Sequence, residues 1–193
     1  MSTTENKVHY DLTNVHVAPL TMDLESGAVT FGTPKRLLGA ISMDLSAQGE
    51  SVKLRADGMD YYVAESNNGY AGDLNIAMVP DWFRQEYMGD TLSDKDKVLV
   101  ENAQSTAKPF ALLYEFLGDA SHRRHCLYNT TASRPNIKGE NKENQKEADT
   151  EALSLTALPL PDGKVKASTT AETPSSVYEN WNKAVWVKDT TTA

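Results

Sequence analysis

The stretch with the most chemical potential is His122-Arg123-Arg124-His125-Cys126. Two imidazoles and a thiolate are ligands that zinc prefers. We predict a strand here, and successive side chains of a strand point to opposite faces. His122 and Cys126 then share one face, whereas His125 lies on the other, so the two histidines cannot hold one ion. The adjacent arginines also repel a cation, and we predict no metal site.

The same alternation argues against nucleophilic catalysis. Cys126 and His125 are neighbours on a strand, so they face opposite ways and make no dyad. We predict that Cys126 is a small buried hydrophobic residue. The stretch GYAGD (69–73) lacks the Lys of a phosphate loop, and its glycines are expected to serve a turn and a close backbone approach. We predict no catalytic, cofactor-binding or metal-binding residue, no cofactor and no enzyme activity.

Aromatic residues leave one weaker alternative open. Trp82, Trp181 and Trp186 are candidates for a sugar-binding platform. Two of them, Trp82 and Trp181, fall on predicted helices, where packing in the core is the commoner use of tryptophan. The sequon at Asn129 matters only in a secreted protein.

The bulk composition excludes several classes of protein. The chain has 193 residues, 39% hydrophobic and 24% charged, which fits one globular domain over 1–193. The formal net charge is −8, so the chain lacks the excess of basic residues that is typical of nucleic-acid-binding proteins. The single cysteine excludes an internal disulfide framework. We see no secretory signal and no apolar run long enough to span a membrane, so we expect a soluble protein made in the cytoplasm.

Alternation of apolar and polar residues dominates the chain and predicts strands. Four segments have one apolar face each: Ile41/Met43/Leu45, Val52/Leu54/Ala56, Leu74/Ile76/Met78 and Leu153/Leu155/Ala157. The stretch FALLYEFL (110–117) is apolar on both faces apart from Glu115, which predicts a strand covered on both sides. Another strand is expected over 125–131, with turns at 67–69 (a hairpin turn), 118–121 and 161–163. The predicted fold is mainly β, an antiparallel sandwich or barrel.

Two short helices and one loop interrupt this pattern. The first helix is predicted over 80–88, with Phe83 and Tyr87 on the face that packs on the sheet. The second is predicted over about 176–183, with a capping box formed by Ser176 and Glu179. The segment 138–149 mixes charges without aromatic or β-branched residues and is predicted to be a mobile loop. Flexible ends are expected at 1–6 and 189–193.

Seven stretches also occur in a telling order: VHYDL (8–12), GAISMDLSAQGE (39–50), ADGMDYYVAESNNGYAGDLNIAMVPDWFRQEYMGD (56–90), LVENAQSTAKPFALLYEFLGD (99–119), RHCLYNTTASRP (124–135), TEALSLTALPL (150–160) and VYENWNKAVW (177–186). Together they resemble the major tail protein (tail tube protein) family of long-tailed, siphovirus-type phages of Gram-positive bacteria. The resemblance covers residues 7–188, and the combination of NNGYAGDL, PDWFR and TASRP is its specific part.

This resemblance implies a tail-tube fold whose six copies close a hexameric ring, with rings stacked into a hollow tube in the virion tail. Genomic DNA would pass through the lumen without specific binding. The implied partners are other copies of the chain and the tape measure, tail-tip and tail-terminator proteins. Among the polar strand residues, Asp44 and Asp73 are candidates to line the lumen. The loop 138–149 is expected either to order against the next ring or to be a solvated surface loop.

Two other functions fit the same sequence. A tail-completion protein would share the structural role, and a carbohydrate-binding β-module of the tail tip would use exposed aromatic residues. An enzyme with a dispersed site lacks support, because no nucleophile lies beside a base.

Overall fold

The computed structural model describes residues 8–23, 25–118, 122–139 and 148–188. The ends predicted at 1–6 and 189–193 lie outside these described residues. So do residues 140–147 of the predicted loop and residues 119–121 of the predicted turn.

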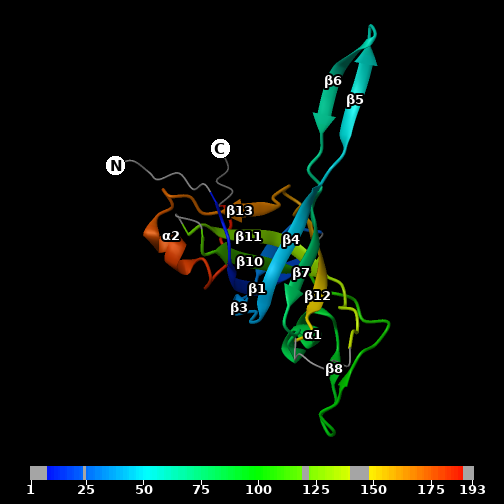
Figure 1. Cartoon of the computed structure of the whole chain (residues 1–193), viewed down its shortest axis with the longest axis vertical. Coiled ribbons are helices and arrows are strands. Elements are labelled where there is room, and N and C mark those ends of the chain that lie inside the picture. The colour runs from blue at the N-terminus through cyan, green and yellow to red at the C-terminus, as the bar shows by residue number, and fades with distance from the viewer. Residues whose placement is uncertain (1–7, 24, 119–121, 140–147, 189–193) are drawn as a thin grey trace.

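The described chain is mainly β with antiparallel strands, which confirms the predicted fold class (Figure 1). Its strands are β1 (Leu12–Met22), β2 (Val29–Phe31), β3 (Lys35–Arg36), β4 (Ala40–Gln48), β5 (Ser51–Ala56), β6 (Met59–Glu65), β7 (Gly69–Ile76), β8 (Thr91–Leu92), β9 (Leu99–Val100), β10 (Phe110–Phe116), β11 (Arg124–Ala132), β12 (Glu151–Leu158) and β13 (Lys166–Ser168). Its helices are α1 (Asp81–Tyr87) and α2 (Ser175–Asn180).

The main sheet has the order β2-β1-β10-β11-β12-β7-β4, with β3 added to β1 and β13 added to β11. Two further pairs, β5-β6 and β8-β9, stand apart from it. In the described part of the chain β4 ends the main sheet and pairs only with β7, and its other side comes near β1 without pairing with it. An unpaired edge presents backbone N–H and C=O groups that can accept another strand.

Strand β10 lies at the centre of the sheet and is buried on both faces, as predicted. Phe110 and Leu112 enter an inner cluster, whereas Ala111 and Leu113 enter an outer one. The inner cluster consists of Val15, Val17, Leu37, Leu74, Ile76, Val79, Phe83, Tyr87, Met88, Phe110, Leu112, Tyr114, Leu127, Ala132, Leu153, Leu155, Ala157 and Val165. The outer cluster consists of Ala18, Leu20, Ala111, Leu113, Cys126, Tyr128, Leu160 and Trp181.

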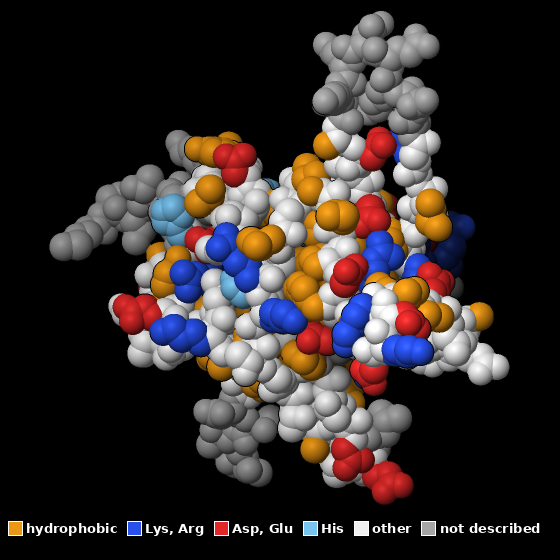
Figure 2. All heavy atoms as spheres, turned by 90° about the horizontal axis from the view of Figure 1, so that it is seen from below, with side chains coloured by type: hydrophobic (Ala, Val, Ile, Leu, Met, Phe, Trp, Pro, Cys, Tyr) orange, Lys and Arg blue, Asp and Glu red, His pale blue; other side chains and the backbone are white. Residues whose placement is uncertain are grey.

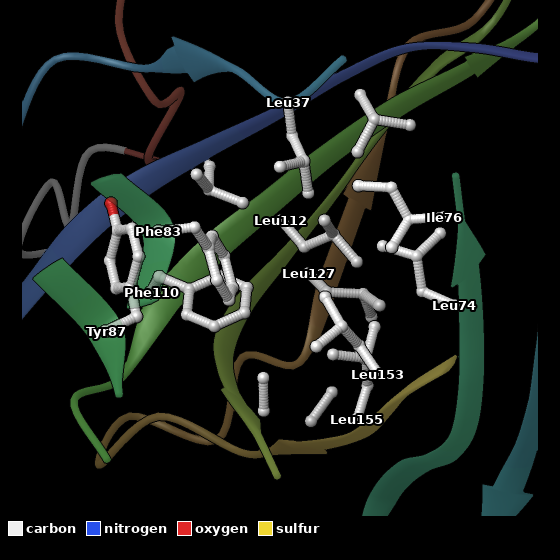
Figure 3. Packing of buried hydrophobic residues seen from close by; sticks show 14 of the residues in the cluster. Leu37, Leu74, Ile76, Phe83, Tyr87, Phe110, Leu112, Leu127, Leu153 and Leu155 are labelled. Atoms are coloured by element: carbon white, nitrogen blue, oxygen red, sulfur yellow. The ribbon is translucent and has the colours of Figure 1, made fainter. Parts of the chain in front are cut away.

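Helix α1 closes the inner cluster and confirms the first predicted helix (Figure 3). Pro80 precedes its first turn, and its φ of −66° suits a helix entrance. Phe83 and Tyr87 are buried on one helix face and form a ring cluster with Phe110 of the sheet. Gly89 follows the helix with a φ of 76°, a backbone conformation that glycine adopts without strain.

Helix α2 covers the outer cluster but differs from the prediction at both ends. It begins after Pro174 and ends at Asn180, and Trp181, placed just beyond it, is buried against the sheet. The predicted capping box is wrong, because the helix starts one residue before Ser176 and no side chain caps it. Ser176 therefore lies within the first turn instead of at the N-cap that a capping box requires.

Two of the predicted apolar faces are only partly correct. Leu74 and Ile76 are buried, but β7 ends at Ile76 and Met78 is exposed. In β4 a bulge between Ala40 and Ser42 leaves Ile41 without a partner in β7, and its side chain is exposed. A bulge redirects the side chains on either side of it, which alternation alone does not reveal.

Three further predicted elements agree with the structure. The predicted apolar face Leu153/Leu155/Ala157 is buried in β12. The strand predicted over 125–131 is β11, and residues 161–163 form the turn between β12 and β13.

Candidate assembly surfaces

The side chains of His125 and Cys126 point to opposite faces of the sheet. The His125 ring stacks on Tyr114 of the inner cluster, with centroids 5.0 Å apart and planes at 18°. Cys126 is fully buried in the outer cluster, which raises the pKa of its thiol. The predictions that Cys126 is buried and that it faces away from His125 are confirmed. The described residues contain no group of three or more His, Cys, Asp or Glu side chains able to hold a metal ion.

The charged residues of this region have a structural use that the sequence did not reveal. Glu115 is buried and lies opposite Arg124 in the pairing of β10 with β11, with Oε2 3.5 Å from the guanidinium Nε. The side-chain amide of Asn14 donates a hydrogen bond to the same carboxylate at 2.9 Å. Arg124 also lies over the ring of Tyr178, 4.0 Å from its centroid, and so attaches α2 to the sheet. A buried carboxylate needs such partners, so Glu115 is satisfied as part of the framework.

The glycines of GYAGD lie in β7, where the neighbouring strands come too close for a side chain. A Cβ on Gly69 would stand 1.9 Å from the carbonyl oxygen of Ala157, and one on Gly72 would stand 2.0 Å from that of Asp44. The predicted close backbone approach is therefore confirmed at both glycines.

The tryptophans do not gather into one platform. Trp82 packs against the inner cluster under the ammonium of Lys35, which lies 3.8 Å from the ring centroid. Trp181 belongs to the outer cluster, and Trp186 stacks on it with centroids 6.2 Å apart. Because the two clusters lie on opposite faces of the sheet, Trp82 is separated from the other two, and the geometry gives little support to a sugar-binding row.

The most conspicuous surface is a hairpin, β5-β6, that projects from the main sheet (Figure 1). Asp57 and Gly58 connect its strands with φ values of 52° and 80°, as a two-residue turn with two positive φ angles requires. An Asp-Gly pair between alternating residues is a strong hairpin signal that our sequence analysis missed.

The predicted hairpin turn at Asn67-Asn68-Gly69 is wrong. Strand β6 pairs with β5, whereas β7 pairs with β4 and β12, so the chain does not reverse there. The side chain of Asn67 instead accepts a hydrogen bond from the backbone N–H of Gly69 at 3.1 Å. Asn and Gly are common both in local bends and in hairpin turns, so these residue types alone could not tell which of the two structures forms.

Backbone hydrogen bonds join the hairpin to the body as one continuous ribbon. The N–H of Ser66 donates to the carbonyl of Glu50 at 3.0 Å, and that of Asn68 donates to Gln48 at 2.8 Å. The Ser66 hydroxyl also accepts a hydrogen bond from the Glu50 N–H at 2.8 Å. At Gly49 a Cβ would stand 2.0 Å from the Ser66 carbonyl oxygen, so the two backbone segments can come this close only because the residue is glycine.

Strand pairing gives the hairpin two unlike faces, because paired residues project to the same side. The polar face carries Lys53 and Arg55, which both contact the Asp60 carboxylate, at 3.5 Å and 3.4 Å. The opposite face, called here the apolar hairpin face, consists of Val52, Leu54, Ala56, Met59, Tyr62 and Ala64.

The apolar hairpin face is not covered by any part of the chain that the structure describes. Its large side chains are exposed: Val52 61%, Leu54 58%, Met59 63% and Tyr62 59%. The predicted alternation of Val52, Leu54 and Ala56 is present, but the expected burial is wrong for Val52 and Leu54 within one chain. A two-stranded hairpin is at best marginally stable alone in water, so such a face calls for a partner.

A second surface is the polar outer face of β4, β7 and β12. Asp44 lies directly opposite Asp73, and both side chains are exposed. On the other side of Asp73, the Ser154 hydroxyl donates to its carboxylate at 2.7 Å. The amide of Asn75 donates to the hydroxyl of Ser42 at 3.0 Å. The two acids that the sequence selected thus share one exposed, hydrogen-bonded face.

Comparison with known proteins adds no identity to these surfaces. The chain matches no model of a known protein family, and no curated protein matches it significantly. In the described part of the chain, neither helix has the length and apolar composition needed to cross a membrane.

Proposed function

We propose that this chain is a structural protein that assembles with copies of itself into stacked hexameric rings, which form the hollow tail tube of a long-tailed phage. The tube delivers DNA into the host, and the protein has no catalytic role. Its further partners are the tape measure, tail-tip and tail-terminator proteins, and its location is the virion tail. The ordered set of sequence stretches described above suggests this function.

The observation that carries the proposal is the uncovered apolar hairpin face. Burying one Val, Leu or Met side chain gives about 1.5–3 kcal/mol, so covering this face on another molecule would provide a substantial driving force. A monomeric protein rarely exposes such a face on a projecting arm. The pattern therefore fits a protein whose working state is an assembly.

Two further features support a conduit. The unpaired edge of β4 has backbone groups for strand addition by a neighbour, which suits a ring with head-to-tail contacts between subunits. The polar face with Asp44 and Asp73 lies beside that edge. A surface of this kind repels phosphates, so DNA would slide past it without being held.

Negative-stain electron microscopy of the purified protein tests the proposal directly. The protein is imaged at high concentration, alone and with tail-tip complexes as seeds. Hollow tubes with a regular axial repeat are expected. Dispersed monomers in the presence of seeds would refute the proposal and favour a tail-completion or glycan-binding function.

A pair of neighbouring substitutions tests the role of the hairpin in this assembly. Leu54→Ser removes an apolar side chain from the apolar hairpin face, whereas Lys53→Ser changes the adjacent residue on the polar face. We expect L54S to lose tubes and K53S to keep them, with the unfolding midpoints of both monomers close to that of the unaltered chain. Equal assembly by the two variants would show that the apolar hairpin face takes no part.

A further inference from the structure

We infer that the hairpin docks on the opposite end of a second copy, at an exposed apolar patch formed by Leu38, Ile41 and Met78. We call this surface the receptor patch. The inference rests on the proposed self-assembly and specifies which surfaces meet. The contact between subunits is then directional, from head to tail: one end of each copy carries the projecting hairpin and the other end carries the receptor patch.

The receptor patch lies where the β4-β7 pair ends. Ala40 lies opposite Ile76, and the Ala77 N–H donates to the Gly39 carbonyl at 2.8 Å. Leu38 lies in the turn that precedes β4, and Met78 follows the end of β7 by two residues. Three apolar side chains are exposed at this end: Leu38 65%, Ile41 52% and Met78 72%.

Local backbone features present these side chains to the surface. Gly39 has a φ of 93°, a conformation that strains residues with a side chain, and it follows Leu38 directly. Leu37, on the other side of Leu38, is buried in the inner cluster. The β4 bulge supplies Ile41 as an extra residue, and bulges of this kind commonly re-aim a side chain. The exposure of this patch is therefore built into the fold.

The apolar hairpin face and the receptor patch lie at opposite ends of the same ribbon. The β4-β7 pair runs from Ala40 and Ile76 at one end to Gln48 and Gly69 at the other, where the hairpin continues it. Figure 1 shows the hairpin at the top of the molecule and β4 and β7 descending from it towards α1. Figure 2 views the molecule from below and shows hydrophobic side chains between charged ones. An apolar centre with a charged rim is the usual anatomy of a protein interface.

A second copy is the occupant that accounts for both surfaces at once. A translation along the ribbon brings the hairpin of one copy to the lower end of the next, so each copy covers one uncovered surface and offers the other. Pairing of two hairpins about a two-fold axis would leave the receptor patch exposed.

The exposed area covers part of what such a contact needs. Four large side chains of the apolar hairpin face are between 58% and 63% exposed: Val52, Leu54, Met59 and Tyr62. Side chains of this size offer on the order of 400 Å² together, about half of the roughly 800 Å² per partner in a stable interface. Polar contacts around the receptor patch would supply the remainder.

Cross-linking between two single-cysteine variants tests the contact. Leu54→Cys places a thiol on the apolar hairpin face, and Met78→Cys places one on the receptor patch. The native Cys126 is fully buried and does not compete. The two variants are mixed at the concentration that gives assembly, or at the highest that the protein allows, and treated with a short bis-maleimide. The three possible dimers differ in mass and are distinguished by mass spectrometry.

We expect the L54C–M78C dimer to dominate in the mixture and to be absent when Lys53→Cys replaces L54C. A dimer formed by L54C alone would show that hairpins pair with each other and would overturn the inference. Absence of the mixed dimer would overturn it as well. Circular dichroism of each variant confirms that the fold is retained.

The same experiment separates this inference from the proposed function. Mixed dimers without rings or tubes in micrographs would support the head-to-tail contact and refute the tube. Tubes without mixed dimers would refute the contact alone.

Discussion

The substitution Phe83→Ala tests how α1 is held on the sheet. Phe83 has no exposed surface, and its ring centroid lies 5.0 Å from that of Tyr87 and 5.6 Å from that of Phe110. Phe110 belongs to β10, so these contacts connect the helix to the centre of the sheet. Alanine in this place leaves a cavity between the two layers and removes two ring contacts.

The expected cost follows from this burial. Replacing a buried Phe by Ala destabilises proteins by about 3–5 kcal/mol, and the fully enclosed ring places Phe83 in the upper part of that range. Native domains are stable by only about 5–15 kcal/mol, so the variant should lose a large part of its stability. Because α1 begins soon after Met78, the receptor patch would lose its support with the helix.

Urea denaturation followed by circular dichroism measures the free energy of unfolding. If F83A does not fold, Phe83→Leu keeps most of the side-chain volume and should cost about 1–2 kcal/mol. Leu54→Ala is the matched control, because it also removes a large apolar side chain but from an exposed site, and we expect a change within about 0.5 kcal/mol. A loss below about 1 kcal/mol for F83A would refute this account of the core, because a buried Phe→Ala change costs several times more.

Three further outcomes are expected. Burial raises the pKa of Tyr114 to about 12, so the folded state holds the phenolic proton more tightly than the unfolded chain does. The free energy of unfolding should therefore fall as the pH rises from about 10 to 12, by up to about 2 kcal/mol more than it does in the Tyr114→Phe variant. Urea titrations at each pH measure this difference. Parallel pH curves for the two proteins would contradict this. The buried thiol of Cys126, whose pKa burial raises, should react with a thiol reagent only after unfolding, and fast labelling of the native protein would show that the outer cluster opens. Gly69→Ala should destabilise by more than about 1 kcal/mol in thermal melts, because its Cβ would meet the Ala157 carbonyl at a positive φ, whereas Gly163→Ala, with open space around it, should cost less.

The amino-acid sequence by itself determined the fold class and several of its elements. Apolar residues on both faces over 110–117, apart from Glu115, predicted a strand covered on both sides, and β10 is such a strand. The Phe83–Tyr87 spacing and the flanking Pro80 predicted α1, because four-residue periodicity and proline placement act within a single turn of helix. These signals are local, so a single sequence carries them in full.

The tertiary structure alone decided which strands pair and where the ribbon turns. Residues 67–69 and the Asp57-Gly58 pair both have turn chemistry, and only the pairing of β4 with β7 and of β5 with β6 shows which of them reverses the chain. The bulge at Ile41 depends on register, which is set between strands that are distant in sequence.

The apolar hairpin face shows most clearly where sequence information stops. Alternation at Val52 and Leu54 correctly predicts an apolar face, which is stabilised when it is covered. It does not say whether the cover comes from the same chain or from another copy, because the hydrophobic effect depends on the area removed from water and not on what removes it. Only the three-dimensional arrangement shows this face projecting beyond the sheet, uncovered by the described part of its own chain.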